Sequence, residues 1–260
     1  MIEWTDEGVI LGVRPHGEGS GVLNLMTREH GRHAGLARGV ASVKSRGIYQ
    51  PGNCVQATWK ARLADQLGTY ICEPTRDHAA VLLDDPLKLA GLSAACAMAE
   101  TALPEREPHP QVYDGLIALL EMMEMMEIPE LGDAWIAGYV RWEIGVLADL
   151  GYGLDLDSCA ATGTNDDLAY VSPRSGRAVS LSAGEPYRDK LLALPRFLLP
   201  GASGLGAGDP DDLFRGLALT GFFLERHVFA THHRAPPPAR NRFVERFAQL
   251  TTLSGGGLSE

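Results

Sequence analysis

The sequence predicts an α+β fold in which a small β-barrel over residues 1–78 precedes a helical domain over residues 79–250. Two observations carry this prediction. Hydrophobic residues alternate with a period of two up to Glu73, between turns rich in Gly, Pro and Asn, and beyond Pro74 the period changes to about three and a half. The 260 residues, of which 45% are hydrophobic, are also sufficient to bury a core.

The first part contains five short predicted strands, over residues 8–13, 22–27, 33–37, 55–60 and 69–72. The longest connection between them spans residues 38–53. This number of strands and this loop layout favour an OB-fold, a closed barrel that commonly binds oligonucleotides. A small SH3-like barrel would give nearly the same pattern and stays open as an alternative.

The second part begins with Asp85 and Pro86, which are typical of a helix cap and first turn. A helix is predicted from there to residue 103, with Leu87, Ala90, Ala94 and Ala97 on its inward stripe. Further helices are predicted over 110–127 and 133–150, the latter with Ile136, Val140, Ile144 and Leu147 inward.

Residues 153–186 interrupt the helical pattern and contain two strand-like pieces, 168–172 and 178–181. Helix is predicted again over 186–199, and a Gly-rich link follows at 201–208. Asp209 and Pro210 cap a long helix with Leu213, Leu217, Leu224 and Val228 aligned, and a last helix is expected over 240–250. Residues 251–260, which include three consecutive glycines, are expected to be a disordered tail.

Positive charge is concentrated in one stretch, although the whole chain carries a net charge of −10. Between residues 28 and 62 a single carboxylate, Glu29, accompanies seven cations: Arg28, Arg32, Arg38, Lys44, Arg46, Lys60 and Arg62. Such a segment is suited to hold a polyanion, most often nucleic acid, against the repulsion of the remaining surface. Ordinary solvated charges on strands and loops are the competing interpretation.

Three histidines near the end of the long helix, His227, His232 and His233, are candidate metal ligands. The spacing from His227 to His232 separates their rings on a helix, so we favour solvated histidines near the helix end. A metal-dependent hydrolase using them remains an alternative function. The sequence supports no other catalytic set and no cofactor.

The sequence contains no apolar run of about 18 residues, and its first residues are polar rather than a cationic, apolar leader. A cytoplasmic protein without membrane contact is therefore expected. The four cysteines are scattered without a CxxC pair, which favours reduced, buried thiols.

Three separated stretches together resemble the RecO family of bacterial recombination mediators, in the expected order. The first comprises Glu7-Gly8-Val9-Ile10-Leu11-Gly12, Gly17-Glu18, Thr27-Arg28-Glu29-His30-Gly31, Ala37-Arg38-Gly39, Ser45 and Gln50-Pro51. The second comprises Arg141-Trp142-Glu143-Ile144 and Leu150-Gly151-Tyr152-Gly153, and the third Cys159-Ala160 and Tyr170-Val171-Ser172-Pro173. Each stretch alone is a weak signal, whereas their order and spacing are fairly specific.

The resemblance implies an N-terminal OB-fold, a helical domain and a small zinc-ribbon-like insertion at residues 153–186. It also implies a protein without covalent chemistry that binds single- and double-stranded DNA and anneals complementary strands at the nucleoid. With RecR, such a protein helps to load RecA onto DNA coated by single-strand-binding protein. In the family the helical domain captures the acidic C-terminal tail of single-strand-binding protein, and Arg141 lies in the matching motif. An internal ion pair of Arg141 with Glu143 or another carboxylate is the alternative.

The sequence departs from the family pattern in two places. Of four zinc-binding cysteines found in some members only Cys159 remains, with Thr162 and Ser180 near two of the other positions, so the insertion is expected to lack zinc. Ala41 and Val43 also stand where cations are common, which predicts weak unaided DNA binding.

The leading hypothesis places DNA phosphates on the barrel face and the 38–46 loop, with Trp59 or Tyr49 as a stacking surface for bases. For both aromatic residues a position in the barrel core is favoured over stacking. An OB-fold adaptor that binds protein but no DNA is a further alternative.

Overall fold

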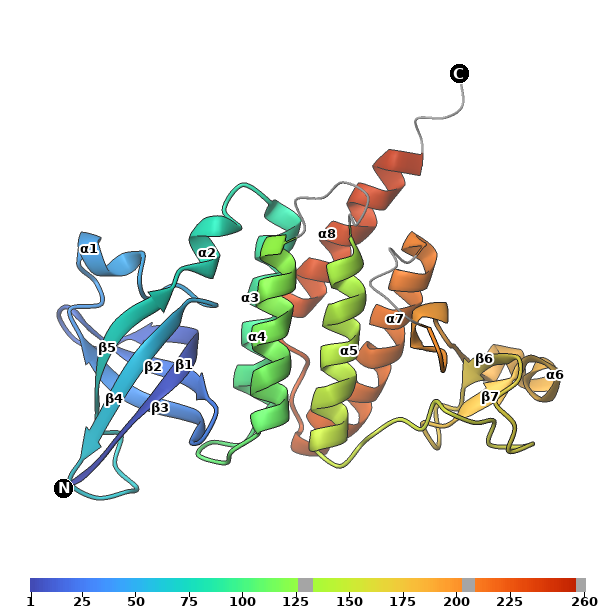
Figure 1. Ribbon diagram of the computed structural model, residues 1–260, viewed down its shortest axis with the longest axis horizontal. Helices are drawn as coiled ribbons and strands as arrows, with labels where there is room; N and C mark the ends of the chain where they lie inside the picture. The colour runs from blue at the N-terminus through green and yellow to red at the C-terminus, as the bar shows by residue number, and fades with distance from the viewer. Residues whose placement is uncertain (126–132, 203–208, 256–260) are drawn as a thin grey trace. The chain divides into compact units, whose positions relative to one another are not determined.

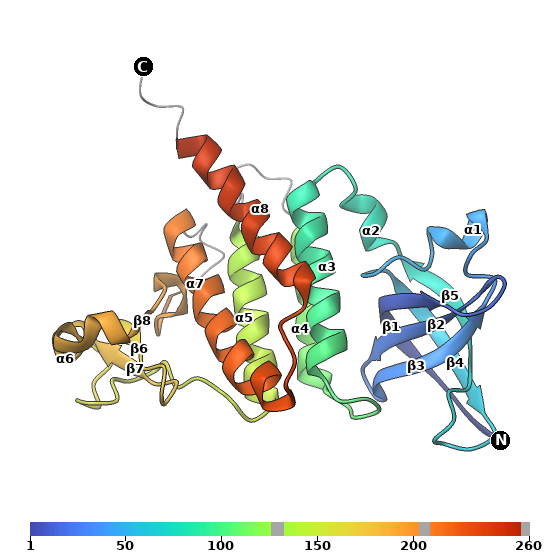
Figure 2. The ribbon, with the colours of Figure 1, turned by 180° about the vertical axis from the view of Figure 1, so that it is seen from behind.

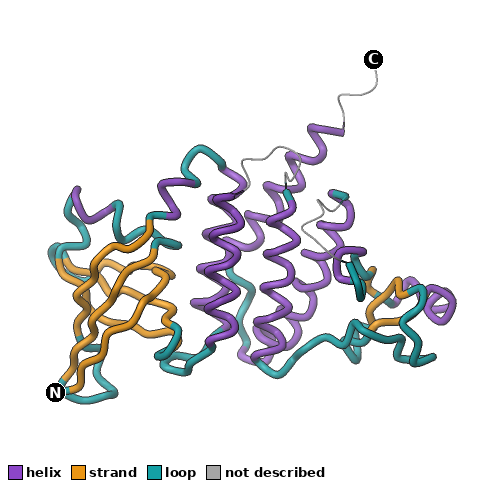
Figure 3. The backbone as a smooth tube through the Cα atoms, in the orientation of Figure 1, coloured by secondary structure: helices purple, strands orange, loops and turns teal. Residues whose placement is uncertain are grey.

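The structure is a computed structural model that describes residues 1–125, 133–202 and 209–255, apart from the side chains of Val43, Lys44, His232 and residues 252–255. The chain forms two compact units, residues 1–124 with 237–243 and residues 125–236 with 244–260. The first contains a barrel of strands with helices, and the second contains helices and a small three-stranded sheet (Figures 1 and 3).

Five strands close into a barrel in the first unit: β1 (Ile2–Pro15), β2 (Ser20–Thr27), β3 (Gly31–Arg38), β4 (Cys54–Ala61) and β5 (Thr69–Arg76). Their order around the barrel is β1-β2-β3-β5-β4, and β4 pairs back onto β1. Strands β3 and β5 run parallel, whereas the other neighbours are antiparallel. This is the closure of an OB-fold, so the predicted barrel is confirmed (Figure 1).

Strand β1 begins at Ile2, well before the start that the hydrophobic pattern predicted. Residues 2–7 are exposed or half-buried and therefore give little hydrophobic signal. They pair residue by residue with β4, from Ile2 opposite Ala61 to Glu7 opposite Gln56. Pairing with a distant strand, rather than local propensity, extends β1.

One end of the barrel is filled by aromatic rings around the buried His33. The Trp4 and His30 rings stack at 4.0 Å, and the His33 ring lies edge-on to Trp59 at 4.8 Å. The Tyr70 hydroxyl lies 3.1 Å from His33 Nδ1. Burial, and secondarily the nearby Arg106 guanidinium, lowers the pKa of His33 to about 4. His33 is therefore neutral at pH 7.

Three helices follow the barrel in the first unit: α2 (His78–Val81), α3 (Pro86–Ala102) and α4 (Pro110–Met125). The predicted cap of α3 is confirmed, because Asp85 Oδ1 accepts hydrogen bonds from the Leu87 and Lys88 amides at 3.0 Å each. The predicted end of α4 at residue 127 lies outside the described residues. Of the predicted inward stripe of α3, Leu87 and Ala94 are buried and Ala90 and Ala97 are half-buried.

Helix α3 lies beside the barrel and packs against β1 and β2 (Figure 2). Asn24 in β2 is 1% exposed, and its Nδ2 donates to Glu100 Oε1 of α3 at 2.7 Å. From Leu23 to Thr27 every residue of β2 is buried. A ligand approaching the barrel from outside therefore meets β3, β5 and β4 rather than β2.

The second unit is built on α5 (Ala134–Asp149) and α7 (Pro210–Phe223), which pack against each other. The Thr220 hydroxyl of α7 donates to Glu143 Oε2 of α5 at 2.5 Å, in a fully buried contact. The predicted cap Asp209 accepts from the Asp211 amide at 3.2 Å. A π-helical segment, Leu224–Phe229, and a 3₁₀ turn, Ala230–His232, continue the helix.

The insertion contains a three-stranded sheet of β6 (Leu168–Val171), β7 (Ala178–Ser180) and β8 (Leu192–Ala193). The helix predicted over residues 186–199 is wrong. That segment contains the 3₁₀ turns Glu185–Lys190 and Arg196–Leu198 on either side of β8. Pro186 and Pro195 lack amide donors, and β8 pairs with β6 instead of continuing a helix. The short helix α6 (Leu181–Gly184) follows β7 directly.

The last helix, α8 (Pro238–Gly255), is longer than predicted at both ends. Part of the tail predicted to be disordered is therefore helical, and residues 256–260 lie outside the described residues. Of the predicted link at residues 201–208, residues 203–208 are likewise not described. Within the described ranges no helix is long and apolar enough to cross a bilayer.

The lowered pKa of His33 predicts a pH-dependent stability. Because its folded-state value, about 4, lies below the ordinary value of 6.5, the unfolded chain binds more protons between these two values. This stabilisation is present above pH 6.5 and is lost as the pH falls toward 4, by at most about 3 kcal/mol.

The measurement is urea unfolding of the full chain as a function of pH. His33→Gln is expected to flatten the rise in unfolding free energy across this window. His16→Gln, a change of an exposed loop histidine, is the matched control and should leave the rise intact. An unchanged pH dependence in His33→Gln would show that other groups cause it.

Candidate nucleic-acid interface

The seven predicted cations differ in what they contact, and three of them are engaged within the first unit. Arg28 forms a bidentate pair with Asp114 of α4, with nitrogen–oxygen distances of 2.9 and 3.0 Å. Lys60 pairs with Glu3 of β1 at 2.9 Å. The half-buried Arg32 donates from Nε to the Leu103 carbonyl at 3.0 Å. The carboxylates of Asp114 and Glu3 offset the charges of Arg28 and Lys60, whereas Arg32 keeps its charge but is half-buried and held by a backbone carbonyl.

Arg38 and Arg46 are the two predicted cations that are available to a ligand. They lie at the end of β3 and in the loop that follows it, and this end of the barrel is here called the open end. Both are exposed, and neither has a carboxylate partner among the described residues. Arg38 ends β3, and Arg46 ends the short helix α1 (Val43–Arg46) in the connection to β4. Lys44 belongs to the same helix, but its side chain is not described.

The connection that carries these cations is held by hydrogen bonds. Ser42 caps α1 by accepting from the Ser45 amide at 3.2 Å. The buried Asn53 donates from Nδ2 to the Gly47 carbonyl at 2.9 Å, and its Oδ1 accepts from the Ala79 amide. Gln50 Nε2 donates to the Arg46 carbonyl at 2.7 Å. The loop therefore presents its cations from an organised backbone.

Arg14 is a further cation at this end that the sequence reasoning did not single out. The sheet register places Arg14 opposite Val22, and Ser20, two residues before Val22, opposite Arg38. Arg14 is exposed and has no ion-pair partner within the described part of the chain. It lies outside the basic stretch of the sequence, and only the strand pairing brings it near Arg38.

A hollow of about 470 Å³, here called the groove, opens where β3 and β5 separate. The two strands pair only at Leu36 with Thr69 and at Ala37 with Tyr70. Beyond these pairs β3 ends at Arg38, whereas β5 continues beside β4. The groove is lined by Leu36, Arg38, Tyr49, Thr69, Tyr70, Ile71 and Cys72.

The groove combines an apolar surface with a cation and has no anionic lining. Ile71, at 62% exposed, contributes an apolar side chain to this surface. Burial raises the pKa of Cys72 to about 12 and also raises the pKa of Tyr49. Both groups are therefore neutral at pH 7, and Arg38 gives the groove its charge.

The two aromatic residues proposed as stacking surfaces have different positions. Trp59 is 1% exposed in the barrel core, and its Nε1 donates to the Leu67 carbonyl at 2.9 Å. It is not available to a base, so that part of the hypothesis is wrong. Tyr49 packs partly against the core and also lines the groove.

Arg62 lies apart from these cations, in the loop between β4 and β5. It is exposed, and Leu63 and Leu67 of the same loop are 55% and 39% exposed. Arg106 holds this loop by donating to the carbonyls of Ala64 and Gln66.

In the second unit Arg141 is half-buried beside Phe197. Its Nη2 donates to the Phe197 carbonyl at 2.9 Å, and its Cζ lies 5.5 Å from the centre of the Phe197 ring. The alternative of an ion pair with Glu143 is not found, since no carboxylate pairs with Arg141 among the described residues. Glu143 instead accepts from Thr220.

The candidate metal ligands of the C-terminal segment do not converge where they are described. The His227 ring stacks with Tyr152 at 5.1 Å and with Phe223 at 5.9 Å. His233 is exposed, with a left-handed backbone, and the side chain of His232 is not described. In the described ranges no three His, Cys, Asp or Glu residues lie close enough to hold a metal ion.

The insertion is held around Cys159 by hydrogen bonds. The Ser180 amide donates to Cys159 Sγ at 3.2 Å, and Sγ also lies 3.4 Å from the Ser180 hydroxyl. Burial alone raises its pKa, but hydrogen bonds with Ser180 and Thr162 prevail and lower it to about 6. Thr162 and Ser180, which stand near two of the family's cysteine positions, thus contact the remaining thiol.

Comparison with known proteins identifies the family. Residues 1–74 match the family model for the N-terminal part of recombination protein O, and residues 83–236 match the model for its C-terminal part.

The chain is also similar to the DNA repair protein RecO of several bacteria. It is 54% identical to that of Rhodospirillum centenum over 256 residues, which cover 98% of both chains. It is 50% identical to that of Rhodospirillum rubrum over 254 residues, which cover 95% of this chain and 96% of the relative. The match to that of Phenylobacterium zucineum is 50% over 252 residues, or 97% of this chain and all of the relative. The chain therefore belongs to the RecO family of DNA repair and recombination proteins.

Proposed function

We propose that this protein is a recombination mediator that binds single- and double-stranded DNA at the open end of its barrel. The observation that carries this proposal is the position of Arg38, which lines the groove, and of Arg46 in the loop that follows β3. Both are exposed and have no carboxylate partner among the described residues, and Arg46 donates only to the Ala41 carbonyl at 3.3 Å. Because the chain belongs to a family of DNA repair proteins, we take DNA as the ligand. The protein acts by binding rather than by covalent chemistry, at the nucleoid in the cytoplasm.

The proposed contacts follow from the chemistry of this surface. Arg38, Arg46 and Lys44 neutralise phosphates, and Arg14 extends the positive surface along the barrel edge. Leu36, Ile71 and the ring of Tyr49 offer an apolar surface to an unstacked base. A duplex would use the cations alone, because its bases are stacked. Two strands held near one positive surface repel each other less, which favours their annealing.

Unaided binding is expected to be weak, because Arg28, Arg32 and Lys60 are engaged elsewhere. We infer that RecR strengthens the contact with DNA, and that the complex loads RecA onto DNA coated by single-strand-binding protein.

The DNA contact is tested with two double variants that remove the same charge. Arg38→Gln with Arg46→Gln is expected to weaken binding of a single-stranded oligonucleotide at least tenfold at 0.1 M salt. Because about 0.7 counterions are released per phosphate contact, the salt slope should fall by about 1.4. Fluorescence anisotropy across a salt series measures both quantities.

The matched control is Arg28→Gln with Lys60→Gln, which should change affinity and slope much less. If both double variants lost affinity and salt slope equally, the assignment would be contradicted, because long-range charge alone would then explain the binding of DNA. Circular dichroism of each variant verifies that the barrel remains folded.

The mediator role predicts dependence on RecR. Annealing of complementary oligonucleotides coated with single-strand-binding protein should accelerate when this protein and RecR are added together, and the Arg38/Arg46 variant should slow it. Annealing that proceeds equally without this protein would refute the role. Binding of RecR without any DNA contact would instead favour an OB-fold adaptor.

A second proposed contact is the acidic C-terminal tail of single-strand-binding protein, captured by Arg141. Arg141 Nη2 donates a hydrogen bond to the Phe197 carbonyl. The other guanidinium nitrogens have no hydrogen-bond partner among the described residues. A guanidinium positioned beside an aromatic ring is suited to a carboxylate that is followed by apolar residues.

Titration of a tail peptide against Arg141→Ala is expected to show a loss of affinity of at least tenfold. Arg141→Lys should recover only part of it, because an ammonium lacks the bidentate fork. Arg215→Ala, which removes an arginine already paired with Asp212, is the control. Unchanged affinity in Arg141→Ala would exclude this contact.

A further inference from the structure

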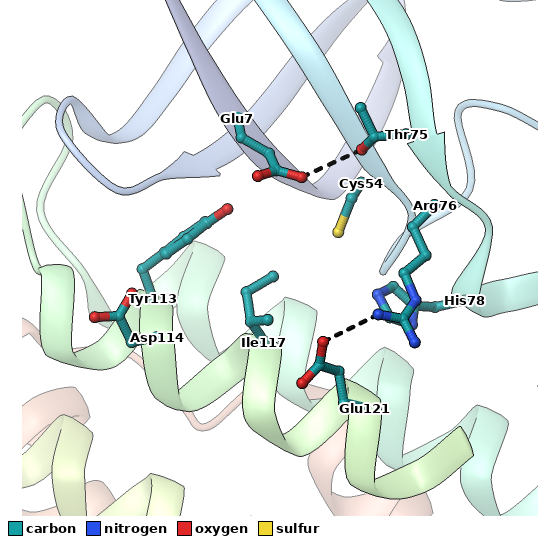
Figure 4. A pocket seen from close by; sticks show the side chains of 9 residues that line it. All are labelled: Glu7, Cys54, Thr75, Arg76, His78, Tyr113, Asp114, Ile117 and Glu121. Carbon is teal, nitrogen blue, oxygen red and sulfur yellow. Dashed lines mark hydrogen bonds and ion pairs between the residues drawn. The ribbon is translucent and has the colours of Figure 1, made fainter. Parts of the chain in front are cut away.

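A cleft of about 350 Å³, which shares no lining residue with the groove, lies between the barrel and helix α4 (Figure 4). Glu7 of β1 and Thr75 of β5 face it from the barrel, and Tyr113 and Ile117 face it from α4. All of these residues belong to the first compact unit.

Ion pairs flank the cleft on two sides. On one side Arg28 pairs with Asp114. On the other side Arg76 bridges Glu121 at 3.0 Å and Glu124 at 2.5 Å. These contacts fix the positions of the lining side chains and leave the space between them open.

The charge of this site is negative. Four carboxylates line the cleft or pair with its lining residues: Glu7, Asp114, Glu121 and Glu124. Among the described residues they form ion pairs with two guanidinium groups, of Arg28 and Arg76. His78 adds no positive charge at pH 7, because burial lowers its pKa. The nearby Glu124 carboxylate raises the pKa, but the effect of burial is larger. Burial raises the pKa of the Cys54 thiol to about 12, so that group is neutral as well.

The Tyr113 hydroxyl is a second and independent sign of a ligand. The residue is only 5% exposed, and its ring directs the hydroxyl toward Glu7 across the cleft (Figure 4). Within the described part of the chain this hydroxyl has no hydrogen-bond partner, and it is accessible from the cleft that the residue lines. The Glu7 carboxylate has a single partner there, a long hydrogen bond of 3.4 Å from the Thr75 hydroxyl.

We propose that this cleft binds an organic cation, an alkylammonium or guanidinium group, between the Glu7 carboxylate and the Tyr113 hydroxyl. The carboxylate supplies the charge, and the hydroxyl accepts a hydrogen bond from an N–H group of the cation. Ile117 offers an apolar surface to the alkyl stem. Such a cation is found both in polyamines and in the lysine and arginine side chains of a partner protein.

The test is calorimetric titration of the full-length protein at low ionic strength with two probes, spermidine and a short peptide containing one arginine. At least one of them is expected to bind. Glu7→Gln and Tyr113→Phe should each weaken that binding about fivefold or more. Both substitutions nearly preserve shape, and circular dichroism verifies the fold.

Glu18→Gln is the matched control, because it removes one exposed carboxylate from the β1–β2 loop. Binding that Glu18→Gln weakens as much as Glu7→Gln would overturn the site in favour of general attraction by an acidic protein. Failure of both probes to bind would overturn it as well. If Glu7→Gln and Tyr113→Phe weaken the binding of spermidine alone, the site is assigned to polyamines. If they weaken the binding of the peptide, it is assigned to a partner's side chain.

A positional readout accompanies these titrations. With ring-labelled tyrosine, the Tyr113 signals, assigned from Tyr113→Phe, should shift on saturation with the probe. Unshifted Tyr113 signals at saturation would overturn the proposal, whatever the affinity.

Discussion

The short parallel pairing between β3 and β5 is the constraint on which the barrel and its surface depend. Only two residue pairs close the barrel there. Large rings pack next to this seam: a side chain at Gly35 would lie 2.5 Å from the Tyr70 ring, and one at Gly68 would lie 2.5 Å from Trp59. Two glycines therefore allow the aromatic core to approach the seam. Because β3 stops at Arg38, the same seam leaves the groove open beside an exposed guanidinium.

Ion pairing, rather than the number of cations, determines how this acidic chain presents positive charge. Exposed pairs such as Lys60 with Glu3 add little stability, but they cancel charge locally. Arg28 is equally exposed, yet Asp114 neutralises it through two hydrogen bonds. Arg38 and Arg46 escape this cancellation because the loop that follows β3 contains no carboxylate. A small local excess of positive charge thus persists on a protein whose net charge is −10.

Features with a local cause could be predicted from the sequence, and those with a distant cause could not. Asp85 and Asp209 cap helices through their nearest amides, so their positions suffice to predict the helix starts. The alternation of the barrel strands is likewise local. The start of β1 depends on β4, and the segment that was predicted as a helix becomes β8 because it meets β6.

The same distinction applies to the sites. The basic stretch indicated that Arg38 and Arg46 are exposed, and the barrel core was the favoured position of Trp59, but nothing in the sequence indicated that Arg14 would lie near Arg38. The cleft could not be found in the sequence at all, because Glu7 and Tyr113 are brought together only when α4 packs beside the barrel. Neither residue is unusual in its own sequence context.

The groove and the cleft are close enough to influence each other through their charges. Ile71 lines the groove and Thr75 lines the cleft, four residues along β5, or about 13 Å for an extended strand. The Debye length is about 8 Å at physiological ionic strength and about 30 Å at 0.01 M. The carboxylates of the cleft would therefore repel a phosphate backbone in the groove more at low salt than at physiological salt. A cation bound in the cleft removes part of that repulsion, so the two proposed ligands would favour each other most where screening is least.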